Sequence, residues 1–202
     1  FATRPLNEDE YMDEASGLVY CQKCHTPRQT NVVITGVPVL APCMCACQTE
    51  AYLQGKAEKA ERDRQMHIAR LREDGLQDKA LREYTFANDN GLNPKMEWAH
   101  RYVEQWDEMK QSASGLLLWG DVGTGKSYFA GCIANALLDR GVSVVMTNFA
   151  AILNTLTGLY SADRGSYLDR LNACSLLIID DLGVERSTEF AMEQVFAVID
   201  AR

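Results

Sequence analysis

The chain has 202 residues, of which 47% are hydrophobic, so it is long enough for one ordinary domain and a small additional module. Its net charge of −8 argues against a protein that coats nucleic acid through bulk positive charge, although it does not exclude a local basic patch. No run of 18 apolar residues occurs, and the acidic first residues lack the pattern of a signal peptide. We therefore expect no membrane partner.

Two features of the ends predict a fragment of a longer protein. The chain opens on Phe1 rather than on methionine, and its last residues, EFAMEQVFAVIDAR, read as a helix without a C-terminal cap. Residues 1–20 are polar and acidic, which predicts a mobile arm.

Residues 21–48 hold five of the seven cysteines, spaced C-x2-C-x18-C-x-C-x-C. The run NVVITGVPVL between the two groups reads as two short strands around Gly36, which predicts a hairpin. CQKCH at 21–25 also fits the pattern for haem attachment, but haem leaves the second cysteine group unexplained and requires export.

A zinc-binding module explains both cysteine groups. Zinc ribbons place two cysteine pairs on either side of a hairpin, near C-x2-C-x15–20-C-x2-C. We expect a closed structural site with four protein ligands, in which His25 is incidental. The expected ligands are four of the five clustered cysteines: Cys21, Cys24 and Cys43, with Cys45 or Cys47 as the fourth.

Residues 49–83 mix acidic and basic residues, as in KAEKAERDRQMHIARLRED. This pattern predicts a solvated helical linker, because a partner-binding coiled coil needs sustained heptads that are missing here. A new helix is expected at Asn93-Pro94. Apolar residues recur at helical spacing along it, and we expect them to pack in the core: Ala99, Tyr102, Val103, Trp106 and Met109.

From residue 115 strands and helices alternate. Short apolar strands are expected at 116–119, 142–148 and 176–180, with an apolar helix at 126–139 and two helical segments before the last strand. This βαβα order predicts an α/β fold with a parallel sheet.

Residues 120–127 read GDVGTGKS, which fits the phosphate-binding pattern G-x-x-x-x-G-K-[ST] between a strand and a helix. Glycines let backbone N–H groups approach phosphate oxygens, and the helix start favours the same anion. Lys126 is expected to reach the β- and γ-phosphates, and the Ser127 hydroxyl to bind Mg²⁺. The predicted ATP-binding residues are Gly120, Asp121, Val122, Gly123, Thr124, Gly125, Lys126, Ser127 and Tyr128.

The apolar strand LLIID is followed by a second aspartate. We expect Asp180 to bind Mg²⁺ together with Ser127, and Asp181 to act as general base toward the attacking water. Asp181 and Lys126 are therefore the predicted catalytic residues. Two loop aspartates capping the next helix would be the alternative, but the pairing with GDVGTGKS favours the site. An ATP site without an export signal also predicts a cytoplasmic protein.

GLLLWGDVGTGKSYFAGCIANAL and LLIIDDLGVERSTEFAMEQVFAVID together resemble the DnaC/DnaI-type replicative helicase loaders and the related IstB-type transposition ATPases. The resemblance covers residues 84–202 and implies an AAA+ ATPase. A cysteine-rich N-terminal module also occurs in such loaders. The resemblance implies a DnaB-type hexameric helicase as partner, gripped by the N-terminal part, with single-stranded DNA as a second ligand and a homo-oligomer in the full-length protein. An IstB-type helper would act on a transposase instead.

The family also suggests roles outside the phosphate loop. An inserted helical element occupies residues 149–173, where Arg164 and Arg170 are candidate DNA contacts or simply solvated cations. Thr147 and Asn148 end the second strand and are candidates for a switch acting on the catalytic acid. Asn148 suits the alternative role of a helix N-cap equally well.

In this family a fourth core strand lies between the first and the third, followed by an arginine finger and a lid arginine. All of these are expected beyond Arg202, so the resemblance predicts a gap in the sheet and poor ATP hydrolysis by residues 1–202 alone. A different class of function is a zinc-dependent adaptor that uses ATP only as a binding switch.

Overall fold

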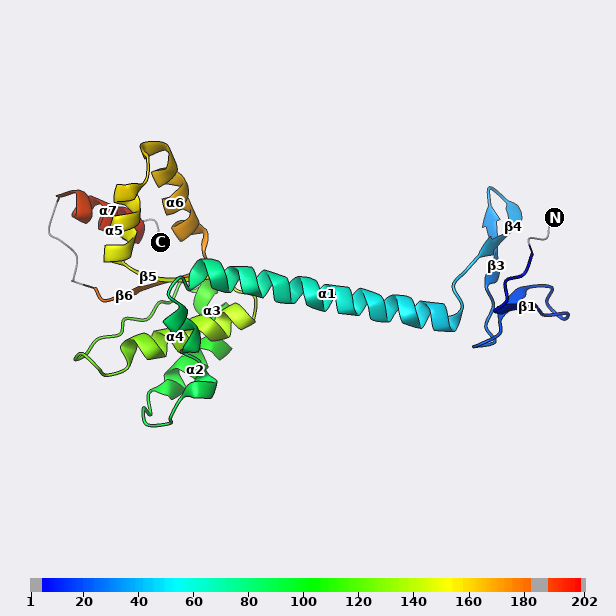
Figure 1. The fold of residues 1–202 in the computed structure, drawn as a ribbon, viewed down its shortest axis with the longest axis horizontal. Helices are drawn as coiled ribbons and strands as arrows, with labels where there is room; N and C mark the ends of the chain where they lie inside the picture. The colour runs from blue at the N-terminus through cyan, green and yellow to red at the C-terminus, as the bar shows by residue number, and fades with distance from the viewer. Residues whose placement is uncertain (1–4, 183–188, 201–202) are drawn as a thin grey trace. The chain divides into compact units, whose positions relative to one another are not determined.

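The computed structural model describes residues 5–182 and 189–200 (Figure 1). The chain divides into two compact units, residues 1–63 and residues 64–202, which are described separately. No helix in the described ranges is long and apolar enough to cross a membrane.

The first unit contains two antiparallel strand pairs. β1 (Glu10–Met12) pairs with β2 (Val19–Cys21), and β3 (Gln29–Ile34) pairs with β4 (Val37–Pro42). Both central residues of the β3–β4 turn lie in the left-handed region, at φ 50° for Thr35 and 82° for Gly36. This is the two-residue hairpin turn whose twist matches that of its strands. The predicted hairpin around Gly36 is therefore present.

The acidic segment 1–20 differs from the mobile arm that the sequence predicts. Its residues 1–4 lie outside the described residues, but Glu10–Met12 and Val19–Cys21 form the β1–β2 pair. The physical reason is charge pairing, because Asp9 and Glu10 form ion pairs with Arg28. Paired carboxylates can be ordered and buried, whereas unpaired ones stay in water.

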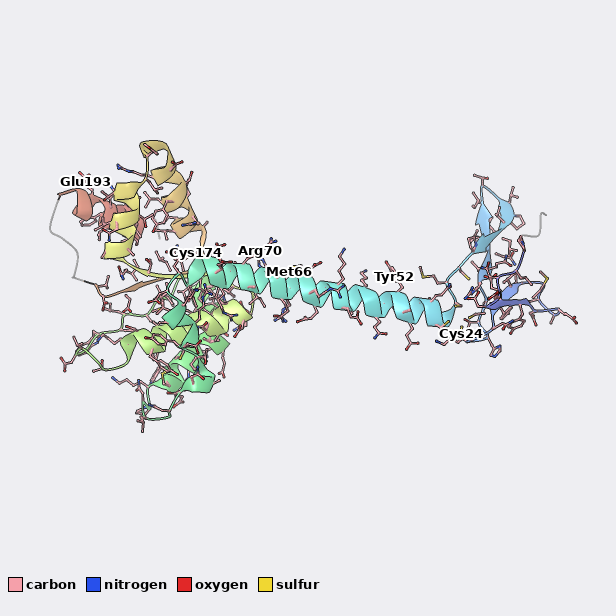
Figure 2. All side chains as sticks on the ribbon, in the orientation of Figure 1. Cys24, Tyr52, Met66, Arg70, Cys174 and Glu193 are labelled. Carbon is pink, nitrogen blue, oxygen red and sulfur yellow. The ribbon has the colours of Figure 1, made fainter. Side chains whose placement is uncertain are left out.

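The charged stretch forms one long helix, α1 (Ala46–Gly75), followed by the 3₁₀ turns η1 (Lys79–Glu83) and η2 (Phe86–Asn88). Its only buried residues are Ile68 and Gly75. Figure 2 shows side chains such as Tyr52 and Met66 standing away from the helix, where both are more than half exposed. Most of α1 therefore lacks an apolar face that could pack against another element.

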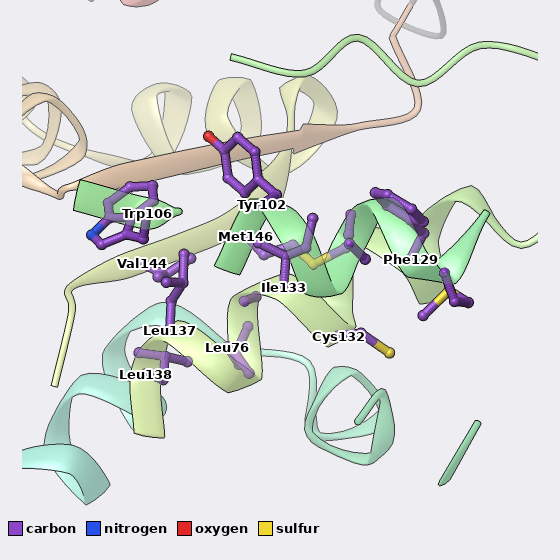
Figure 3. Packing of buried hydrophobic residues seen from close by; sticks show 14 residues of the cluster. Leu76, Tyr102, Trp106, Phe129, Cys132, Ile133, Leu137, Leu138, Val144 and Met146 are labelled. Carbon is purple, nitrogen blue, oxygen red and sulfur yellow. The ribbon is translucent and has the colours of Figure 1, made fainter. Parts of the chain in front are cut away.

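The second unit is built on two parallel strands, β5 (Val144–Asn148) and β6 (Leu176–Asp180). Side chains alternate between two cores. One core packs the sheet against α2 (Met96–Glu104), α3 (Trp106–Gln111) and α4 (Lys126–Asp139), as Figure 3 shows. The other packs it against α5 (Phe149–Gly158), α6 (Ser161–Ala173) and α7 (Glu189–Asp200). The predicted parallel α/β core is confirmed.

Two local predictions in this unit need correction. Helix α2 begins at Met96 rather than at Pro94, because Asn93 first forms a turn in which its side chain accepts from the Lys95 amide. The strand expected at 116–119 is not formed, and these residues are exposed. A strand requires a hydrogen-bonded neighbour. Residues 116–119 instead line a cleft together with β6.

Gly75 ends α1 against the backbone of β5. A Cβ at this position would lie 1.9 Å from the Val144 carbonyl oxygen, so Gly75→Ala forces the two elements apart. We expect it to lower the free energy of unfolding of the second unit by about 1–3 kcal/mol. The matched control is Gly165→Ala on α6, where nothing lies within 4 Å; there alanine should stabilise by about 0.5–1 kcal/mol. Chemical denaturation measures the free energy of unfolding of both variants. Equal changes in the two variants would contradict the close contact at Gly75.

Candidate functional site

The phosphate loop is shaped by three glycines at φ values that other residues rarely adopt. Gly120, Gly123 and Gly125 have φ of 144°, 81° and 83°, and Gly125 is the N-cap of α4. The Thr124 hydroxyl closes the turn by donating to the Asp121 carbonyl at 2.9 Å. The loop thereby leads directly into a helix N-terminus, where backbone N–H groups and the helix dipole favour an anion.

Lys126 is held by the loop that it follows. Its Nζ donates to the carbonyl oxygens of Gly120 at 3.0 Å and Asp121 at 2.8 Å. The ammonium therefore lies against the backbone of the loop, and a bound phosphate could replace these carbonyls as its partner. Ser127, the next residue, is half-buried in the first turn of α4.

The lysine and both aspartates line one cleft. Lys126, Asp180 and Asp181 surround a space of about 610 Å³, whose walls also include the apolar residues 116–119 and 176–179. Asp180 is the last residue of β6, and Asp181 turns away from the strand at φ 51°. The fold thus places a cation and two carboxylates, from segments more than fifty residues apart, around a cleft large enough for a nucleotide.

Four cysteines gather in the first unit. The Sγ atoms of Cys21, Cys24, Cys45 and Cys47 all lie within 4.8 Å of one another. The Sγ atoms of Cys45 and Cys47 are 3.3 Å apart, and those of Cys21 and Cys47 are 3.7 Å apart. Both distances are too long for a disulfide bond, whose S–S length is near 2.05 Å. Four sulfurs around Zn²⁺ at about 2.3 Å would be separated by roughly 3.8 Å. The set therefore fits a tetrahedral zinc site.

Cys43 lies outside this group, which corrects the ligand set expected from sequence. Its Sγ lies 3.5 Å from the Pro27 carbonyl oxygen, and its amide donates to the Arg28 carbonyl. Cys43 therefore continues the end of β4, and its thiol points to the Pro27 carbonyl rather than into the cluster. Cys45 and Cys47 flank the first residue of α1 and supply both positions of the second pair. The His25 ring faces Tyr11, with Nδ1 3.3 Å from the hydroxyl.

The thiols are tuned in opposite directions. The Thr26 hydroxyl and the Cys47 amide lower the pKa of Cys24 to about 5, and backbone N–H groups lower the pKa of Cys21. Crowding by Cys45 and Cys24 raises the pKa of Cys47 to about 12. Four thiols this close cannot all ionise without a cation, and a bound Zn²⁺ would supply the charge that permits it.

A family model for the IstB-like ATP binding protein matches residues 50–202. The chain belongs to the IstB-like ATP-binding family. The match contains every residue that lines the cleft of Lys126, Asp180 and Asp181, and it begins after Cys47, so the cysteine cluster lies outside the family domain.

Curated relatives of this family member include helicase loaders. The replicative helicase loader DnaC of Escherichia coli (strain K12) is 29% identical over 107 residues, which are 52% of this chain and 42% of DnaC. DnaC of Buchnera aphidicola subsp. Schizaphis graminum is 24% identical over 127 residues, 61% of this chain and 50% of that protein. The uncharacterized protein YdaV of E. coli K12 is 26% identical over 154 residues, which are 74% of this chain and 62% of YdaV. The chain spans about half the length of these relatives.

Other predicted residues of this IstB-like chain lie away from the cleft. The Tyr128 hydroxyl donates to the Thr85 carbonyl at 2.8 Å, so its ring packs beside Tyr84. Asn148 caps α5 by accepting from the Ala151 amide at 2.8 Å, the alternative role considered for it. Thr147 lines a different, smaller cavity at the end of α1.

The two candidate DNA contacts are both on α6. Arg164 Nε donates to the Leu159 carbonyl at 3.3 Å, and the Arg170 guanidinium lies 5.4 Å from the centre of the Tyr167 ring. Six residues apart on a helix, the two side chains leave on different faces. A shared role in binding DNA stays a prediction.

Asn135 is a site-supporting residue that sequence reasoning missed. It is 2% exposed on α4, and its Nδ2 donates to the carbonyls of Leu81 at 2.8 Å and Tyr84 at 3.0 Å. These bonds fasten η1 to the helix that carries the phosphate loop. The signal was available, because Asn135 is the one strongly polar residue within the apolar run GCIANALL.

Proposed function

We propose that this protein is an ATP-hydrolysing loader that places a DnaB-type hexameric helicase on single-stranded DNA. The observation that carries the proposal is the single cleft that brings Lys126 to Asp180 and Asp181 in a chain whose relatives include DnaC. We further propose a homo-oligomer in the full-length protein.

The cleft assigns a task to each residue. The loop amides and Lys126 would hold the phosphates of ATP, and Ser127 with Asp180 would hold Mg²⁺. When bound, Mg²⁺ supplies positive charge against the phosphate oxygens. Asp181, exposed at the end of β6, would orient the attacking water and accept its proton.

Asp181→Asn separates this function from the adaptor alternative. We expect the full-length variant to bind ATP within about threefold of wild type while hydrolysing it at least about 100-fold more slowly, because a general base contributes roughly 10²–10⁴-fold. Helicase loading should fall with hydrolysis, measured as helicase retained on single-stranded DNA. Normal loading by the variant would favour the adaptor.

The first unit is proposed to be the helicase-docking head, shaped by one structural Zn²⁺. The β3–β4 hairpin supports this role, because residues 29–42 carry no charge. Val33, Ile34 and Val37 expose 72%, 56% and 58% of their surface near its tip. Uncharged, exposed aliphatic surface suits an apolar protein partner and offers nothing to a phosphate backbone.

Ile34 and Val37 face each other across the hairpin, so Ile34→Thr combined with Val37→Thr removes one apolar pair while keeping β-branched residues. We expect at least about tenfold weaker helicase binding, since burying such side chains is worth about 1.5–3 kcal/mol each. Interferometry with the cognate DnaB-type helicase measures the change. The control Leu92→Thr alters an apolar residue of the second unit that is even more exposed, and an equal loss there would contradict hairpin docking.

A transposase is the alternative partner that the resemblance to IstB-type transposition ATPases implies. Parallel pull-downs with the cognate helicase and with a candidate transposase decide between them. Capture of the transposase alone would reverse the proposal.

A further inference from the structure

Arg28 lies directly behind the cysteine cluster and is itself no metal ligand. Its amide donates to the Val19 carbonyl at 2.7 Å, and its carbonyl accepts from the Cys43 amide at 2.8 Å. The backbone at Arg28 therefore joins β2, which ends at Cys21, to the segment that leads into Cys45 and Cys47.

The Arg28 side chain is buried, with 9% of its surface exposed. Nη1 donates to Glu10 Oε1 at 3.0 Å, and Nη2 donates to Asp9 Oδ2 at 2.6 Å. The same Nη2 lies 3.6 Å from the Cys21 Sγ, within the range of an N–H···S bond. One guanidinium thus contacts a sulfur of the cluster and two carboxylates of the N-terminal segment.

Arg28 places one positive charge between the sulfur cluster and two carboxylates. Four thiolates around one Zn²⁺ leave an excess of about two negative charges, which is costly in a buried site. A guanidinium keeps its charge at any relevant pH, and its five N–H donors can hydrogen-bond the sulfur and both carboxylates at the same time. Asp9 and Glu10, and more weakly Cys45 and Cys21, raise the pKa of Arg28 above that of free arginine.

The carboxylates in turn fix the orientation of the guanidinium. The Glu10 side chain is only 2% exposed, and its Oε2 also accepts from the Asn7 amide at 3.1 Å. The Asp9 carbonyl accepts from the Gln22 amide, next to Cys21. Residues 7–10 are therefore fastened to the first cysteine pair through both side chains and backbone.

We propose that Arg28 is the positioning residue of the cysteine site, donating to the Cys21 thiolate and coupling metal binding to the docking of residues 7–12. This role rests on the proposed zinc site. It predicts that zinc stabilises the acidic strand β1, and that loss of zinc loosens it. It also predicts that loss of the Arg28 donors raises the nucleophilicity of Cys21 more than that of the other three thiolates, because a hydrogen bond to a thiolate draws on its lone pairs.

The test uses the full zinc-loaded chain. Arg28→Met removes the guanidinium N–H donors while keeping a side chain of similar length. Arg28→Lys keeps the positive charge but replaces the planar guanidinium with an ammonium. Lys23→Met is the control, because it removes an exposed cation from the same loop. Competition with a chromophoric chelator should show zinc affinity lowered by about 10- to 100-fold in Arg28→Met, less in Arg28→Lys and unchanged in Lys23→Met.

A second readout separates positioning from mere folding. Alkylation by iodoacetamide, mapped by mass spectrometry, should accelerate selectively at Cys21 in Arg28→Lys, while hydrogen exchange should increase at residues 7–12. Zinc affinity within twofold of wild type in both Arg28 variants would overturn the proposal and leave the zinc site intact. Equal acceleration at all four cysteines would also overturn it. A wild-type chain that takes up no zinc would refute the site itself.

Discussion

Replacing Cys45 with serine is expected to abolish stoichiometric zinc binding and to unfold the first unit. Cys45 is fully buried, and its Sγ lies 3.3 Å from that of Cys47. The unit has two small strand pairs and little other core, so its stability depends on the metal, whose binding contributes about 10–16 kcal/mol in small zinc modules. Atomic emission after gel filtration should find close to one zinc per wild-type chain and almost none in Cys45→Ser.

The control for this prediction is a cysteine two residues away. Cys43→Ser makes the same chemical change at a thiol that points to the Pro27 carbonyl, outside the cluster. It should retain zinc in full, along with the far-ultraviolet spectrum of the wild type. If Cys43→Ser loses zinc as completely as Cys45→Ser, the ligand set given by the geometry is wrong.

Replacing Lys126 with alanine should weaken ATP binding by about 100-fold. A charge-assisted hydrogen bond to phosphate is worth about 1.5–3 kcal/mol, and Lys126 is the one cation among the described residues that line the cleft. The variant also removes two hydrogen bonds to the loop carbonyls, while the bond from the Thr124 hydroxyl to the Asp121 carbonyl remains. Titration with a fluorescent ATP analogue measures the affinity of the chain directly.

Lys110→Ala is the matched control for the phosphate loop. Lys110 is exposed on α3 in the same unit, where its Nζ donates to the Ser175 hydroxyl at 3.4 Å. The same loss of charge there should leave ATP binding unchanged. Binding by Lys126→Ala within threefold of wild type would show that the cleft is not the nucleotide site.

Patterns that depend on neighbours in sequence were predicted well. The helix at 126–139 and the strand at 176–180 have the predicted limits, because the phosphate loop and the apolar run define them locally. The hairpin around Gly36 is equally local, since its turn needs residues at positive φ.

What could not be predicted depends on contacts between distant residues. Residues 116–119 have the composition of a strand but no hydrogen-bonded neighbour in the described structure. Glu10 looks like a solvated acid in sequence, yet it is buried against Arg28. Cys43 and Cys45 are equivalent in spacing, and only the end of β4 and the start of α1 decide which one faces the cluster.

The contact at Gly75 also bears on aggregation. The Ser143 carbonyl accepts from amides at the start of β6, so the next carbonyl, that of Val144, points to the opposite edge of β5, where Gly75 approaches. The end of α1 thereby blocks this edge of β5 at Val144, and an open strand edge is a template for pairing with a second chain. We expect a side chain at Gly75 to weaken this block and to favour self-association.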